Sequence, residues 1–331
     1  MNFSTFRQRA VTGVISGLFT GLSSAARSVS FRNPAKHGVE VFKDVPYRSP
    51  LDRSGDHLLD VYRPAHMGVE PRPVVLHVHG GGFTILSKDT HWLMGMRLAR
   101  MGYVVFNINY RLAPKGRFPL AFEDCADAYA WVVQNAHIYG GDISRFVLAG
   151  ESAGGNLVSA LALAAVTVQP DPGAHRVFES GVVPRAVVPI CGMLQVSDVA
   201  RHARGKKHSV LALSRMQKIE ASYLPQDGRA NFGLADPLLV AESELKALRP
   251  WPAFFLPCGT WDPVLDDTVR MGPALQRAGA RAEVRLYAGE PHAFHALVFR
   301  KKARACWRDI GRFLDEVLGE TRAVPVASRR A

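Results

Sequence analysis

The amino-acid sequence predicts an α/β protein in which a mostly parallel central sheet is flanked by helices. From Val74 onward, short apolar runs alternate with stretches of helical periodicity, which is typical of β-α-β units. The apolar runs are nearly continuous, as expected for strands covered on both faces. With 47% hydrophobic and 21% charged residues in 331, the chain has the composition of a globular protein with a large core.

Each expected element follows from a run of this kind. Two antiparallel strands are expected first, over residues 39–47 and 57–62, joined by a turn at residues 53–56. Parallel strands are then expected over residues 74–79, 104–109, 146–150, 186–191, 253–258 and 282–286. Helices are expected between them, over residues 90–101, 121–136, 153–166, 264–278 and 303–318.

The domain organisation is expected to be one large α/β unit with a helical cap, because no Pro/Gly/Ser-rich linker divides the chain. The α/β core is assigned to residues 51–193 and 246–320. Residues 194–245 break the strand and helix rhythm with a basic loop and a helix expected over 209–223, so they are predicted to be a cap insertion. Residues 1–50 are predicted to be a helical segment of the cap, and residues 321–331 a disordered tail.

The N-terminal segment contains an amphipathic stripe. Its larger apolar residues fall at helical spacing: Val11, Val14, Ile15, Leu18, Phe19 and Leu22. This spacing favours a cap helix. Interfacial membrane attachment and a cleaved signal peptide, suggested by Arg7 and Arg9 before an apolar stretch, are the alternatives. A cytoplasmic location is expected, with peripheral membrane contact through this segment as an alternative and secretion less favoured.

The formal net charge of +12 raises the question of an anionic partner. The basic residues form only local runs, at residues 201–207 and 300–304, and no nucleic-acid motif or series of stacking aromatic residues accompanies them. A solvated basic face is therefore expected, with attraction to a membrane surface as the alternative. No nucleic-acid partner is expected.

The cysteines give no sign of a metal or redox motif. Cys125, Cys191, Cys258 and Cys306 are widely spaced and form no C-x-x-C pair. They lie in apolar stretches, which favours buried free thiols and fits a reducing compartment.

A G-x-S-x-G motif, Gly150-Glu151-Ser152-Ala153-Gly154, joins an expected strand to an expected helix. In that context the serine can lie on a tight turn with its hydroxyl exposed, and the glycines allow strand and helix to approach closely. Glu151 has two interpretations, which are pairing with a cation or backbone group near the turn, or solvation of the helix start. The motif predicts Ser152 as a nucleophile.

A second motif, His79-Gly80-Gly81-Gly82, directly follows another expected strand. Its backbone can bend so that successive N–H groups point into one cavity. The N–H groups of Gly81 and Gly82, together with that of Ala153, are predicted to hold the oxyanion of a tetrahedral intermediate. His79 is expected to orient this loop rather than to transfer a proton, and His77 to be a strand side chain rather than a metal ligand.

A serine nucleophile requires a histidine base and a carboxylate that fixes the histidine tautomer. Downstream, Asp262 follows one late expected strand and His292 follows the last one, which are positions at the edge of the sheet where active sites lie. Asp266, Asp267 and His295 are the competing assignments, since each lies within about one helical turn of the favoured residue.

The motifs together resemble the hormone-sensitive-lipase family of α/β-hydrolases, also called bacterial family IV esterases. The matching segments are His79-Gly80-Gly81-Gly82, Tyr110-Arg111-Leu112-Ala113-Pro114, Gly150-Glu151-Ser152-Ala153-Gly154, Asp262-Pro263-Val264-Leu265-Asp266 and His292-Ala293-Phe294. Two positions depart from the family pattern, because many relatives have Asp in place of Glu151 and Gly in place of Ala293.

The resemblance implies the α/β-hydrolase fold and an esterase that acts on short- to medium-chain acyl esters through an acyl-enzyme, without metal or organic cofactor. By position, Ser152 would attack, His292 would transfer the proton and Asp262 would hold the histidine. A homodimer through the last strand is common among relatives. Three alternatives stay open on the same fold: an amidase or lactonase, an interfacial lipase, and a ligand receptor, which the filled triad positions disfavour.

Overall fold

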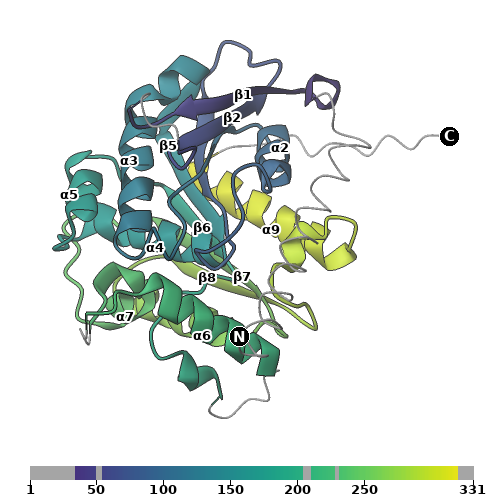
Figure 1. The fold of residues 1–331 in the computed structure, drawn as a ribbon. Coiled ribbons are helices and arrows are strands. Elements are labelled where there is room, and N and C mark those ends of the chain that lie inside the picture. The colour runs from purple at the N-terminus through teal and green to yellow at the C-terminus, as the bar shows by residue number, and fades with distance from the viewer. Residues whose placement is uncertain (1–33, 50–53, 204–209, 228–230, 320–331) are drawn as a thin grey trace.

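The central sheet of the computed structural model has eight strands in the order β1-β2-β4-β3-β5-β6-β7-β8 (Figure 1). The structure describes residues 34–49, 54–203, 210–227 and 231–319. The strands are β1 (Val39–Pro46), β2 (Leu58–Pro64), β3 (Arg72–Val78), β4 (Val104–Ile108), β5 (Gly141–Glu151), β6 (Ala186–Ile190), β7 (Ala253–Gly259) and β8 (Ala282–Tyr287). Strand β2 is antiparallel to β1 and β4, and all other pairs are parallel, which confirms the predicted class.

Helices connect these strands and cover both faces of the sheet. The α-helices are α2 (Trp92–Arg100), α3 (Leu120–Asn135), α4 (Ala153–Val166), α5 (Pro172–Glu179), α6 (Val210–Tyr223), α7 (Pro237–Glu242), α8 (Leu265–Arg277) and α9 (Lys301–Leu318). The 3-10 turns are η1 (Pro34–His37), η2 (Ala136–Tyr139), η3 (Val199–Ala203), η4 (Gly233–Ala235) and η5 (Phe294–Ala296). Among the described residues, no helix is long and apolar enough to cross a membrane.

Two hydrophobic cores form because successive strand side chains point to opposite faces. Val74 and Leu76 pack with α3, α4, α5 and α8, whereas Val75 packs with α2 and α9. Figure 1 shows α2 and α9 on one side of the sheet and α3, α4 and α5 on the other. Every residue of α4 is buried, which explains why its sequence is apolar around the whole helix.

Several predicted boundaries need correction or lie outside the described residues. Residues 39–46 form β1 rather than the end of a helical segment reaching residue 50, because this stretch pairs with β2. The helix expected over residues 209–223 is found as α6, whereas α5 and α7 were not predicted. The amphipathic stripe of residues 11–22 and the predicted tail at residues 321–331 lie outside the described part of the chain.

Candidate active site

Ser152 lies on the tight turn between β5 and α4. Its φ is 56°, in the left-handed region, and its backbone N–H donates to the carbonyl of Ile190 at 3.0 Å. The flanking glycines are required by close backbone contacts. A Cβ on Gly154 would lie 2.0 Å from the carbonyl oxygen of Val78, and one on Gly150 would lie 2.6 Å from that of Gly154. The turn therefore exists only with glycine at both positions.

The structure brings Ser152, His292 and Asp262 together at the carboxyl ends of β5, β7 and β8. Ser152 Oγ lies 2.9 Å from His292 Nε2, and His292 Nδ1 lies 2.9 and 3.0 Å from the two carboxylate oxygens of Asp262. The Asp262 carboxylate is fully buried and also accepts the N–H of Val264 at 2.9 Å. The His292 side chain is 34% exposed, so a substrate can reach it.

The electrostatics of this pair stabilise the imidazolium that forms when His292 accepts a proton. Burial disfavours the His292 imidazolium, but the adjacent Asp262 carboxylate outweighs burial and raises the pKa of His292. With Nδ1 donating to Asp262, Nε2 is free to accept a proton from the Ser152 hydroxyl. The arrangement can therefore transfer a proton from serine to histidine and stabilise the resulting positive charge.

The alternative candidates for the acid and the base, Asp266, Asp267 and His295, lie outside the hydrogen-bonded chain that contains Ser152. Asp266 is 47% exposed and lies 3.7 Å from Arg270, and Asp267 is bonded to other backbone and side-chain groups. His295 is buried, and burial lowers its pKa to about 4. None of the three forms a hydrogen bond with Ser152 or His292 in the described part of the chain, which favours Asp262 as the acid and His292 as the base.

The glycine loop, residues 80–82, lies against the turn that holds Ser152. A Cβ on Gly80 would be 3.3 Å from the Ser152 Cβ. Gly81 and Gly82 have φ values of 111° and 60°, and a Cβ on Gly81 would come within 2.1 Å of the Ile85 carbonyl oxygen. In the described structure the N–H groups of Gly81, Gly82 and Ala153 have no hydrogen-bond acceptor in the protein.

His79 contacts the glycine loop rather than the reacting groups. Its Nδ1 donates to the carbonyl of Gly80 at 2.7 Å, and its ring stacks on Tyr110 with centroids 4.4 Å apart. The Tyr110 hydroxyl donates to the His79 carbonyl at 3.0 Å. Burial lowers the pKa of His79 to about 3, so the ring is neutral at physiological pH. These contacts fit the expected orienting role.

Glu151 connects the glycine loop to two buried histidines. Its carboxylate accepts the Gly80 N–H at 2.6 Å and lies 2.7 Å from His91 Nε2 and 3.2 Å from His77 Nε2. Burial alone would raise the pKa of Glu151, but His91 and His77 outweigh burial and hold this pKa well below its usual range. Burial likewise disfavours the charged form of His91, but Glu151 outweighs burial and raises its pKa. The structure thus supports pairing rather than solvation of Glu151.

No sequence pattern predicts a role for His91. It lies just before α2 and reaches Glu151 only because β3 and β5 are neighbours in the sheet. His77, expected as a strand side chain, is indeed buried on β3 but also belongs to this network. Both contacts join residues far apart in the sequence, so no local pattern predicts them.

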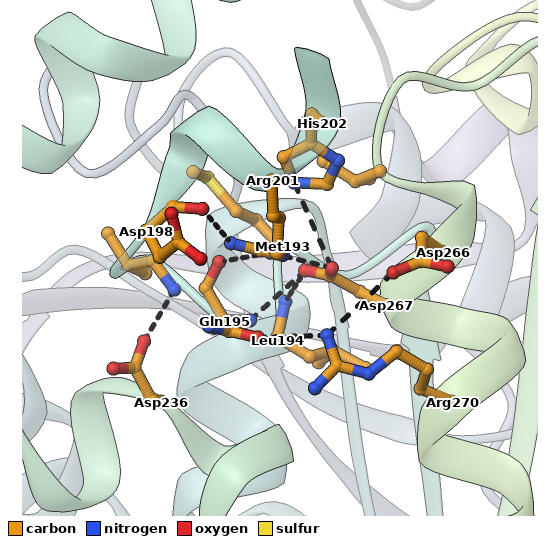
Figure 2. A network of polar contacts seen from close by, with 12 residues as sticks. Met193, Leu194, Gln195, Asp198, Arg201, His202, Asp236, Asp266, Asp267 and Arg270 are labelled. Atoms are coloured by element: carbon orange, nitrogen blue, oxygen red, sulfur yellow. Dashed lines mark hydrogen bonds and ion pairs between the residues drawn. The ribbon is translucent and has the colours of Figure 1, made fainter. Parts of the chain in front are cut away.

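A second polar network joins the segment after β6 to α8 (Figure 2). Asp267, in the first turn of α8, accepts the N–H groups of Leu194 and Gln195 at 2.8 and 3.0 Å and an Arg201 N–H at 2.7 Å. Asp236, at the start of α7, accepts two further N–H groups of this segment. The entry to the predicted cap is therefore fixed to the helix that directly follows Asp262.

Among the described residues, one group of three side chains has donor atoms suited to a metal ion. Atoms of Cys191, Asp262 and His292 lie within 4.8 Å of one another. Asp262 and His292 are already bonded to each other, and burial raises the pKa of Cys191 to about 11, so the thiol is protonated at neutral pH. The donor set overlaps with the proposed proton-transfer pair.

α/β-Hydrolases have a nucleophilic serine on a strand-to-helix turn. Their acid and histidine follow the ends of later strands, as Asp262 and His292 do here. The family model for the alpha/beta hydrolase fold matches residues 75–296, well over half of the chain. The chain therefore belongs to the α/β-hydrolase family.

Similar proteins place the chain among esterases. Versiconal hemiacetal acetate esterase of Dothistroma septosporum is 30% identical over 267 residues, covering 76% of this chain and 77% of that protein. Hormone-sensitive lipase of Mus musculus is 36% identical over 124 residues, which are 37% of this chain but only 16% of that protein. A solved structure of an esterase from Pyrobaculum calidifontis is 26% identical, with a TM-score of 0.70, and the match covers 92% of this chain and 93% of that one. The family resemblance seen in the sequence is confirmed.

Proposed function

We propose that the protein is a serine carboxylesterase in which Ser152, His292 and Asp262 form the catalytic triad. The observation that supports this most directly is the continuous chain of hydrogen bonds from Ser152 Oγ through His292 to Asp262, with distances of 2.9 to 3.0 Å. The nucleophile lies on the turn that this chemistry requires, and the esterase relatives favour carboxylic esters as substrates.

In the proposed reaction, Ser152 Oγ attacks the ester carbonyl carbon while His292 Nε2 accepts the hydroxyl proton. The carbonyl oxygen becomes an oxyanion, which the N–H groups of Gly81, Gly82 and Ala153 would hold. Removing one such donor from a serine hydrolase costs about 10²–10³ in rate. His292 then returns the proton to the leaving alcohol, and an acyl-enzyme forms on Ser152.

Deacylation repeats these steps with water as the nucleophile. His292 accepts a proton from the water as it attacks the acyl carbonyl, and returns that proton to Ser152 when the carboxylic acid leaves. Asp262 orients His292 and stabilises the imidazolium.

Short- to medium-chain acyl esters are the proposed substrates. The resemblance to family IV esterases supports this class, and the name of the Dothistroma septosporum relative specifies an acetate ester. The test is hydrolysis of p-nitrophenyl acetate, butyrate, octanoate and palmitate by the wild type and by Ser152→Ala.

We expect the shorter esters to be hydrolysed and the Ser152→Ala variant to lose roughly 10⁴-fold or more of this activity. Matched p-nitroanilides assayed in parallel test the bond specificity. A clear preference for anilides would replace the esterase proposal with an amidase, and equal activity of wild type and variant would remove Ser152 from the mechanism.

A further inference from the structure

Helix α6 packs directly on the glycine loop. A Cβ on Gly82 would lie 2.5 Å from Ile219 Cδ1 and 3.8 Å from Arg215 Nη2, so two residues one turn apart on α6 contact this position. Arg215 also donates a hydrogen bond to Thr84 Oγ1 at 3.2 Å. The Arg215 guanidinium therefore lies beside the backbone that is proposed to hold the oxyanion.

The contact between α6 and this loop is well packed, so the position of Arg215 is defined. Tyr223, two turns further along α6, stacks on Phe83 with ring centroids 3.6 Å apart, and its carbonyl accepts the N–H of Phe118 at 2.8 Å. Ile219 and Tyr223 are both buried. Arg215 lies on the same face of α6 as Ile219 and Tyr223, so the packing of this face places Arg215 next to the glycine loop.

Arg215 is half-buried, and in the described part of the chain it has no carboxylate partner. Burial lowers the pKa of its guanidinium, and no described carboxylate offsets this effect.

Three other partly buried arginines of the protein have such a partner. Arg201 lies 2.7 Å from Asp267, Arg270 lies 2.6 Å from Glu242, and Arg111 lies 2.7 Å from Asp124. A partly desolvated cation is costly without an anion, and an arginine fork matches a carboxylate in geometry. Arg215 is thus a cation beside the proposed active site that is suited to an anion from outside the chain.

We infer that Arg215 binds a carboxylate on the substrate, so that the preferred esters carry a negative charge in their acyl or alcohol part. This inference rests on the proposed esterase function. The anionic group would lie beside the glycine loop, where it would hold the ester with its carbonyl near Ser152. The net charge of +12 would further favour the approach of such substrates.

The experiment compares pairs of esters that differ in one charge, with acid release measured by pH-stat titration. For the acyl part, glutaric acid monomethyl ester is compared with methyl pentanoate. For the alcohol part, 3-acetoxypropanoate is compared with propyl acetate. The wild type is expected to show a higher kcat/KM for the charged member of one pair. The pair that shows this preference indicates whether the carboxylate belongs to the acyl part or to the alcohol part of the substrate.

Variants on α6 test whether Arg215 causes this preference. Arg215→Gln is expected to lower kcat/KM for the charged ester roughly 10- to 100-fold, the range of one charge-assisted hydrogen bond, and to leave the neutral ester within about threefold. Arg215→Lys should restore part of the preference. The matched control is Lys218→Gln, which removes an exposed positive charge from the same helix and should leave the ratio unchanged.

Two results would overturn the inference. One is a wild type that prefers the neutral ester in both pairs. The other is a fall of equal size for charged and neutral esters in Arg215→Gln, which would indicate a general role of Arg215 in the loop. Hydrolysis of the neutral esters and its loss in Ser152→Ala test the esterase function separately, so failure of one proposal is distinguishable from failure of the other.

Discussion

At the scale of single residues, Glu151 joins the turn of the nucleophile to the glycine loop. Glu151 is 4% exposed and its carboxylate accepts the Gly80 N–H, so the loop position depends on this side chain. His91 Nε2 and His77 Nε2 lie 2.7 and 3.2 Å from this carboxylate. A neighbour of the nucleophile in sequence therefore positions the loop that is proposed to hold the oxyanion.

Replacing Glu151 by Gln removes the negative charge and keeps the size of the side chain. We expect a loss of about 3 kcal/mol in the free energy of unfolding at pH 6, because a buried ion pair is broken. We also expect a fall in kcat/KM of up to about 100-fold through displacement of the loop. The checks are chemical denaturation and ester hydrolysis.

The stability difference should depend on pH with a defined sign. Because the folded-state pKa of His91 is raised, the stabilisation from its charged form is complete below the ordinary histidine pKa of about 6.5 and is lost as pH rises through the folded value. The difference in the free energy of unfolding between the wild type and Glu151→Gln should therefore become smaller as pH rises over that range. Glu151→Asp is the control, since it keeps the charge, and a gap as large as that of Glu151→Gln would contradict the role assigned to the charge.

At the scale of elements, α8 connects two parts of the site. Its residue Asp267 holds the backbone of Leu194 and Gln195 and pairs with Arg201 (Figure 2). The loop before α8 contains Asp262. Met193, the residue before Leu194, donates its N–H to the carbonyl of Ser152 at 3.1 Å. The segment leading into the predicted cap is thus fixed to the helix that follows Asp262 and to the backbone of Ser152.

Asp267→Asn should therefore destabilise the protein by about 3–5 kcal/mol, because the Arg201 guanidinium loses its buried partner. The matched control is Asp266→Asn, one residue away and 47% exposed, for which a change within about 1 kcal/mol is expected. Thermal unfolding of both variants measures the difference. Equal stabilities for the two variants would show that the Asp267 network contributes little to holding this segment.

At the scale of the whole molecule, the sequence predicts the parallel sheet because its strands are continuous apolar runs. It also predicts the site, because Ser152, Asp262 and His292 each follow a strand and the ends of parallel strands lie at one edge of the sheet. The helices α5 and α7 were missed because they have only 8 and 6 residues, too few to establish a periodicity. The contacts of His91 and Arg215 could not be predicted, since both depend on how distant segments pack.

The central claim is that Ser152 is the nucleophile of an ester hydrolase, and covalent labelling tests it most directly. The wild type and Ser152→Ala are incubated with a p-nitrophenyl alkylphosphonate, and intact mass and peptide mapping are measured. The serine oxygen should displace p-nitrophenolate, so we predict one phosphonyl adduct per wild-type chain, located on Ser152, and none on the variant. An unlabelled wild type, or an adduct on another residue, would contradict the account.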